Sequence, residues 1–211
     1  MTPIAPTLQA FFTDRLTRQL DASPRTIASY RDTLLLLRFA QETTGTPPSA
    51  LDWADLDEAL VAAFLAHLER ERGNGARTRN LRLTAIRSHF RDAALRHPEH
   101  AGVIARVLSI PPKRFERRAI TFLRADEAGE LMDAPDQGRW EGRRDLALLM
   151  LALQAGLRIS ELIALDCADV VLGTGAHVRC HGKGRKQRAV PLTAAAQAVL
   201  GVWLKERAGR A

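Results

Sequence analysis

The chain has 211 residues, of which 46% are hydrophobic and 5% aromatic, and its 31 basic and 24 acidic side chains give a formal charge of +7. This composition predicts a folded core in one large or two small domains and favours an anionic partner. Two cysteines without paired spacing exclude a zinc site and a disulfide framework, and the lack of a signal peptide or a long apolar run indicates a cytoplasmic protein.

The spacing of apolar residues in the first half of the chain predicts four amphipathic helices, over residues 7–20, 23–45, 55–71 and 74–96. Ser23 is the expected N-cap of the second helix, with Pro24 at its first position, and Gly45 ends it. Tyr30, the single tyrosine, falls on the same face as Leu34. We therefore expect Tyr30 to pack against other apolar side chains rather than to react.

The fourth helix lies in an arginine-rich segment. Between Arg70 and Arg96 there are eight arginines and two acids. One helical face carries Arg77, Arg87 and Arg91 without any acid, opposite an apolar face. Two interpretations are open with equal weight: a solvated surface, or a helix laid against DNA, where arginine binds phosphates and guanine edges.

A basic segment with two adjacent prolines, residues 111–122, is predicted to be an interdomain linker. After it the sequence predicts helices, a strand–turn–strand hairpin and a last helix, over residues 124–136, 141–156, 159–165, 177–192 and 194–209. Gly156 is expected to end the apolar helix, Ser160 to cap the short one and Thr193 to cap the last. The hairpin region 179–188 holds five basic residues and no acid.

Arg158 is a charge inside the apolar run LALQAGLRISELIAL. Because an unpaired buried charge is costly, it needs a partner. Glu161 and Asp166 are candidates within the chain, and a bound molecule is the third.

Two motifs stand in order, GLRISEL at residues 156–162 and GKGRKQRAVPL at residues 182–192. With SPRTIASYRDTLLLLRFAQ and ARTRNLRLTAIRSHFRDA in the first half, the chain resembles the tyrosine recombinases, or phage integrases, and especially their Xer-like members. The resemblance implies a mainly α fold. Residues 1–110 would form a four-helix SAM-like core-binding domain, residues 111–122 the linker, and residues 123–211 an incomplete α+β catalytic domain with a small antiparallel β-hairpin.

The resemblance also implies roles for individual residues. Arg158 would bind the nonbridging oxygens of the scissile phosphate, which suits a planar guanidinium that stays charged. Lys183 would be the general acid that protonates the departing 5′ oxygen. Glu161 would orient its neighbours, and the chemistry would need neither a metal nor a cofactor.

Double-stranded DNA is the expected partner, together with other recombinase subunits, and neither a membrane nor a small-molecule substrate is expected. The residues expected to contact DNA are Arg77, Arg87, Arg91, Arg185, Lys186 and Arg188.

The sequence departs from the family's pattern after the lysine. The family continues with an HxxR motif, a further His or Trp and the tyrosine nucleophile, and these do not follow here. The segment HLER, at residues 67–70, fits the HxxR pattern, but it lies in the wrong domain and before the lysine. We therefore expect a truncated chain, either a fragment or a remnant left by a mobile element, that cannot form the 3′-phosphotyrosyl intermediate alone. This leaves its status as an enzyme open.

Two other interpretations remain. The chain could be a DNA-binding regulator that occupies recombination sites or pairs with an intact recombinase and inhibits it. Alternatively, it could be a protein-interaction module whose basic charge is incidental. A protein-interaction module would have weak DNA affinity that hardly depends on salt, whereas phosphate binding weakens steeply as salt rises.

Overall fold

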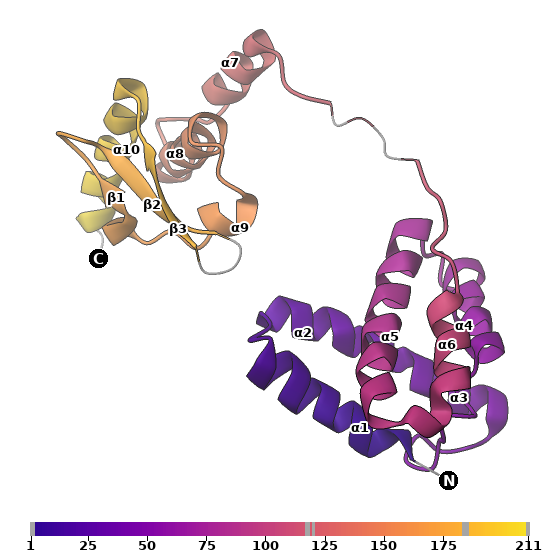
Figure 1. The fold of residues 1–211 in the computed structure, drawn as a ribbon. Coiled ribbons are helices and arrows are strands. Elements are labelled where there is room, and N and C mark those ends of the chain that lie inside the picture. The colour runs from indigo at the N-terminus through magenta and orange to yellow at the C-terminus, as the bar shows by residue number, and fades with distance from the viewer. Residues whose placement is uncertain (1–2, 117–118, 120, 183–185, 210–211) are drawn as a thin grey trace. The chain divides into compact units, whose positions relative to one another are not determined.

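A computed structural model of the protein describes residues 3–116, 119, 121–182 and 186–209 (Figure 1). The chain divides into two compact units, Met1–Arg118 and Ala119–Ala211. Both are rich in helix, and the described strands form one small antiparallel sheet in the second unit. The fold class is therefore the mainly helical one that the sequence predicts.

The first unit is all helical. Its helices are α1 (Ile4–Ala10), continued by a π-helical segment (Phe11–Gln19), α2 (Pro24–Arg31), α3 (Leu35–Thr44), α4 (Glu58–Arg70), α5 (Ala76–Arg96) and α6 (Ala101–Ser109). The Ser23 side chain accepts a hydrogen bond from the Thr26 N–H at 3.2 Å, and Pro24 follows it, so the expected start of α2 is confirmed. Gly45, at φ 74°, ends α3 in the left-handed conformation.

The long helix predicted over residues 23–45 is interrupted. A 3-10 turn, Asp32–Leu34, separates α2 from α3. Because a 3-10 helix has three residues per turn instead of 3.6, three such residues rotate the following face by roughly 60°. The fully buried residues of α3 are accordingly Leu36 and Ala40, whereas Leu34 is only half-buried.

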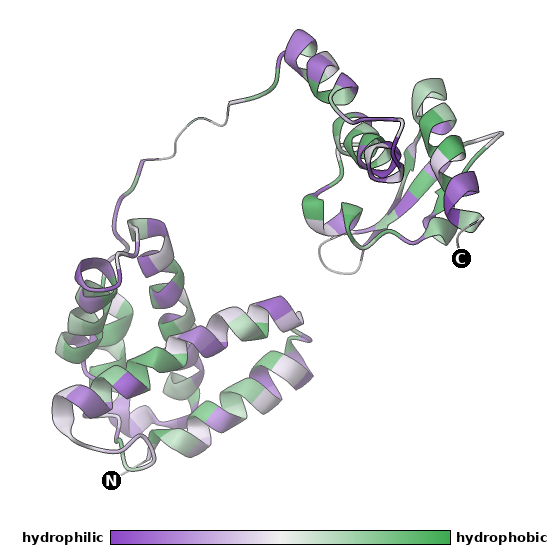
Figure 2. Ribbon diagram, turned by 180° about the vertical axis from the view of Figure 1, so that it is seen from behind, coloured by the Kyte–Doolittle hydropathy of each residue, from purple (hydrophilic) through white to green (hydrophobic). Residues whose placement is uncertain are grey.

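The core of this unit gathers around Trp53, in the segment between α3 and α4, with Phe64 of α4 and Phe90 of α5. Figure 2 shows hydrophobic and hydrophilic residues interleaved along these helices, as expected where each helix buries one face. The sequence did not predict α6, whose Ile104 and Val107 belong to the same core. The four predicted helices therefore share their core with a further one.

The second unit combines helices with the sheet. Its elements are α7 (Ala125–Asp133), α8 (Trp140–Gln154), α9 (Ile159–Leu162), β1 (Val170–Val171), β2 (His177–His181), β3 (Gln187–Pro191) and α10 (Ala194–Ala208). The sheet order is β1-β2-β3, with Cys180 opposite Arg188 across β2 and β3. The hairpin is thus confirmed, and β1 is an addition to it.

The sheet buries Val178 and Cys180 in a core shared with α8 and α10. The indoles of Trp140 and Trp203 lie 4.8 Å apart between their centroids, which joins the start of α8 to α10. Thr193 accepts a hydrogen bond from the Ala196 N–H at 3.2 Å and caps α10 as predicted. Across the described residues, no helix combines the length and apolarity that crossing a membrane requires.

Candidate nucleic-acid interface

Arg158 lies in a break between two helices. The helix α8 ends at Gln154, and Gly156 turns the chain with φ 57°. Arg158 is extended, at φ −67° and ψ 148°, and precedes α9 as its N-cap residue. The sequence suggested Ser160 as the cap, but Ser160 lies within α9 and the N-cap residue is Arg158. Oε2 of Glu161 accepts a hydrogen bond from the Arg158 N–H at 2.9 Å. A carboxylate in the first turn can do this without strain and also suits the helix dipole.

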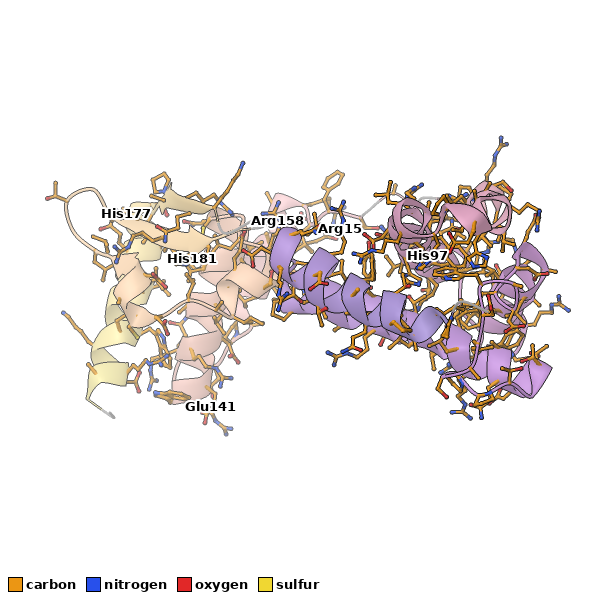
Figure 3. All side chains as sticks on the ribbon, turned by 60° about the horizontal axis from the view of Figure 1, so that its bottom comes forward. Arg15, His97, Glu141, Arg158, His177 and His181 are labelled. Atoms are coloured by element: carbon orange, nitrogen blue, oxygen red, sulfur yellow. The ribbon has the colours of Figure 1, made fainter. Side chains whose placement is uncertain are left out.

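The arginine in the apolar run is not buried. Leu157 and Leu162, which precede and follow it in the sequence, belong to the core, whereas 67% of the Arg158 side chain is exposed. The Arg158 side chain is labelled in Figure 3. Its Nη1 donates to Oε1 of Glu161 at 3.0 Å. Of the two candidates within the chain, the partner is thus Glu161 and not Asp166, and this contact leaves most of the Arg158 side chain exposed.

Glu161 is the buried anion of the site, with 3% of its side chain exposed. Besides Arg158 it binds Arg188 of β3, whose Nη1 and Nη2 donate to Oε1 and Oε2 at 2.8 Å each. The hydrogen bonds from the Arg188 side chain, with those from Arg158, lower the pKa of Glu161 from 4.5 to about 2. The carboxylate therefore stays ionised at neutral pH, and the three side chains together carry one positive charge.

The tip of the hairpin is only partly described. Lys183 and Arg185, expected as general acid and DNA contact, lie outside the described residues. The Gly182 N–H donates to the Lys186 carbonyl at 2.7 Å, and Lys186 is exposed. Arg188, another expected DNA contact, has both terminal nitrogens on Glu161, with 38% of its side chain exposed.

The arginines expected on α5 separate into two kinds. Arg77 and Arg91 are exposed. Arg87 is half-buried, and its Nη2 donates to the Ile110 carbonyl at the end of α6. Burial, followed by repulsion from Arg91 and Arg79, lowers the pKa of Arg87. Arg87 thus caps α6, a helix that the local sequence pattern does not predict.

Asn80 of α5 also has a structural contact. Its Nδ2 donates to the Lys113 carbonyl at 2.7 Å, and its Oδ1 accepts from the Lys113 N–H at 2.8 Å. Arg79 binds the Pro111 carbonyl at 3.0 Å. The first residues of the expected linker are therefore attached to α5. Neither partner could be read from the local sequence, because more than thirty residues separate donor from acceptor.

Two other side chains that could have carried chemistry are engaged elsewhere. The ring of Tyr30 is half-buried and stacks on Phe11 at 6.0 Å between centroids. His67, of the HLER segment, pairs with Glu71 at 3.0 Å. In the part of the chain that the structure describes, no group of three or more His, Cys, Asp or Glu side chains could hold a metal ion.

The chain matches two family profiles. The profile of the phage integrase family matches residues 121–211, and that of the phage integrase N-terminal SAM-like domain matches residues 10–97. Each profile falls within one of the two compact units.

Curated relatives match over nearly the whole chain. A putative integrase/recombinase of Sinorhizobium fredii is 51% identical over 204 residues, which are 96% of this chain and 61% of the relative. A second one from that organism is 40% identical, over 90% of this chain and 68% of its own length. The tyrosine recombinase XerC of Pelotomaculum thermopropionicum is 37% identical, over 87% of this chain and 59% of the relative. The chain thus spans about 60% of the length of the first and third of these proteins.

Solved structures share the fold at lower identity. The XerH site-specific recombinase, in a post-cleavage complex with its palindromic difH substrate, superposes with a TM-score of 0.63 and 22% identity. The match covers 89% of this chain and 54% of XerH. The Tn1549 transposon integrase, in complex with transposon right-end DNA, gives a TM-score of 0.61 and 14% identity over 94% of this chain and 65% of the integrase. With two profiles and these relatives in agreement, the chain belongs to the tyrosine recombinase (phage integrase) family.

Proposed function

We propose that this chain binds duplex DNA and that Arg158 binds a phosphate of the backbone. The observation that carries the proposal is the arrangement at α9, where a buried, ionised Glu161 holds Arg158 while most of the Arg158 side chain is exposed. Arg188 balances the charge of Glu161, so the site keeps one positive charge at the surface. A fixed, charged fork of N–H donors fits the oxygens of a phosphodiester.

In the reaction of the family, Arg158 would stabilise negative charge on the scissile phosphate, and Lys183 would protonate the departing 5′ oxygen. Cleavage also needs a tyrosine hydroxyl as nucleophile. The one tyrosine of these 211 residues, Tyr30, lies in the first unit and stacks on Phe11. We therefore assign DNA binding and phosphate positioning to these residues, without strand cleavage by them alone.

The relatives support this proposal. XerH is described in complex with its difH substrate and the Tn1549 integrase in complex with transposon DNA. The exposed Arg77 and Arg91 on α5 and Lys186 on the hairpin provide further cations for phosphate contacts. Other recombinase subunits would be additional partners on a DNA site.

Fluorescence anisotropy with a labelled duplex tests DNA binding. The logarithm of the binding constant should fall linearly with the logarithm of the salt concentration, with a slope of about −0.9 for each phosphate neutralised. Four or more such contacts would give a slope of about −4 or steeper. Binding that is absent at low salt, or that does not respond to salt, would contradict the proposal and favour a protein-interaction module.

A regulator of an intact recombinase is the second candidate, favoured by the packing of Tyr30, the one tyrosine of these 211 residues, on Phe11 within the first unit. Such a chain should inhibit cleavage by a full-length relative on the same DNA site when added in equimolar amounts. Inhibition that persists when the DNA sites are in excess over both proteins would support pairing with the recombinase, because competition for DNA sites alone is then relieved.

A further inference from the structure

Glu161 accepts four hydrogen bonds from two arginines. Oε1 accepts from Nη1 of Arg158 at 3.0 Å and from Nη1 of Arg188 at 2.8 Å. Oε2 accepts from the backbone N–H of Arg158 at 2.9 Å and from Nη2 of Arg188 at 2.8 Å. A carboxylate offers about four lone-pair positions, so these donors fill its capacity.

We propose that Arg188 is a positioning residue: by occupying half of the Glu161 carboxylate, it leaves Arg158 a single side-chain hydrogen bond to that carboxylate and keeps its guanidinium directed toward DNA. This inference rests on the proposed function, because it takes Arg158 as the phosphate-binding group. It also changes the role expected for Arg188 from the sequence: Arg188 would position Arg158 and would not contact DNA itself.

A buried carboxylate is costly when it loses a hydrogen-bond donor. With 3% of its side chain exposed, Glu161 cannot replace a lost donor with water at little cost. If Arg188 were absent, two acceptor positions would open next to Arg158, the other cation on this carboxylate among the described residues. A bidentate pair with Glu161 would then draw the guanidinium of Arg158 inward.

Arg188 is poorly placed to bind DNA itself. Both of its terminal nitrogens donate to Glu161, and these bonds raise the pKa of Arg188. The hairpin backbone also lies close to the pair, since a Cβ added at Gly182 would stand 3.3 Å from Oε1 of Glu161 and 3.4 Å from Nη1 of Arg188. The ion pair therefore joins the turn end of the β2–β3 hairpin to the start of α9.

The first test follows the Arg158 side chain in the full chain without DNA. Nuclear magnetic resonance of the arginine Nε–Hε groups should show a changed chemical shift and order parameter for Arg158 in Arg188→Ala. Arg179→Ala is the matched control, because it removes a cation from β2 whose Nη2 binds the Ala168 carbonyl and not Glu161. It should leave the Arg158 signal unchanged.

The second test is a double-mutant cycle on duplex affinity with Arg158→Ala, Arg188→Ala and both together. If Arg188 acts through Arg158, the double variant should bind about as weakly as Arg158→Ala alone, a coupling of roughly fivefold or more. Arg188→Lys, which keeps one charge but cannot form the bidentate pair, should restore only part of the affinity.

An unchanged Arg158 signal, or losses of affinity that multiply, would overturn the inference and make Arg188 a direct contact or a purely structural residue. If Arg188→Ala does not fold, Arg188→Lys and Glu161→Gln carry the same comparison. If the unsubstituted chain does not bind DNA, the proposed function fails, and the Arg158 signal alone still decides whether Arg188 positions it.

Discussion

Arg188 and Glu161 lie 27 residues apart in the chain and form a bidentate ion pair with both N–O distances at 2.8 Å. The pair fastens β3 to α9 and sets the environment of Arg158, which is bound to the same carboxylate. Because the carboxylate is nearly buried, its charge affects both the stability of the second unit and the presentation of Arg158.

The pH dependence of the second unit should reflect Glu161. Its pKa is lowered from 4.5 to about 2 in the folded chain, so the stability that the carboxylate contributes is complete above about pH 4.5 and is lost as the pH falls towards 2. Glu161→Gln should destabilise the unit at neutral pH and flatten its pH dependence in this window. Hydrogen exchange of β3 peptides measures this locally.

The control for this prediction is Glu130→Gln, on an exposed glutamate of α7. This variant should keep both the stability of the parent chain and the slope of stability against pH. Equal pH dependence for the parent and Glu161→Gln would show that the ion pair does not hold Glu161 ionised.

Gly182→Ala should weaken the packing at the turn end of the hairpin. The added Cβ would lie 3.3 Å from Oε1 of Glu161, so the ion pair must shift by a few tenths of an ångström. We expect the free energy of unfolding to fall by about 1 kcal/mol, as is typical of mild overpacking. Gly129→Ala, in α7 with open space around its Cβ position, should instead be neutral or stabilising by up to about 1 kcal/mol. Thermal unfolding of both variants checks this, and a fully neutral Gly182→Ala would argue against the close approach.

The first unit should lose stability in mild acid through His89. Its ring packs between Phe11 and Trp53, and both ring nitrogens lack a hydrogen-bond partner among the described residues. Burial, followed by repulsion from Arg96 and His97, lowers its pKa from 6.5 to about 4. Because the folded chain disfavours the charged ring, the stability from neutral His89 is complete above pH 6.5 and is lost as the pH falls to about 4, by roughly 3 kcal/mol.

Hydrogen exchange of α5 peptides between pH 7 and 4 measures this loss. His89→Phe should remove most of the pH dependence, since a phenyl ring fits an aromatic environment and cannot be protonated. His181→Phe, on the exposed end of β2, should leave it in place. A parent chain whose α5 is equally protected at both pH values would contradict the prediction.

Substitutions of the α5 arginines should affect different properties, either DNA affinity or the stability of the first unit. Arg77→Ala and Arg91→Ala remove exposed cations and should weaken DNA binding while lowering the salt slope by about one each. Arg87→Ala should lower the thermal stability of the first unit by roughly 1–3 kcal/mol, because the Ile110 carbonyl loses its donor. Anisotropy and thermal unfolding on the same three variants check this. A stable Arg87→Ala with the largest loss of affinity would reverse the assignment.

Much of the helical fold follows from local signals. Ser23 and Thr193 each accept from a backbone N–H three residues ahead, and Gly45 and Gly156 adopt positive φ where helices end. The start of α6 was missed because Pro98 and Gly102 interrupt its apolar spacing. The two-residue strand β1 is too short to show any alternation.

The site was predictable only in part, for a physical reason. Arg158 and Glu161 are three residues apart, so a capping contact between them is a local property of the sequence. Arg188 and Arg87 are bound by partners 27 and 23 residues away, which only the folded chain brings near. Basic residues that look equivalent in the sequence thus differ in the fold: Arg77 and Arg91 are exposed, whereas Arg87 and Arg188 are hydrogen-bonded within the chain.

The most direct test of the DNA-binding assignment compares two single substitutions in the same anisotropy titration. Arg158→Ala should lower the magnitude of the salt slope by about one and reduce affinity for duplex DNA. Arg139→Ala, which removes a cation 78% exposed near α8 and paired with Asp136, should leave both values unchanged. Equal slopes and affinities for the parent chain and the two variants would contradict the assignment of a phosphate to Arg158.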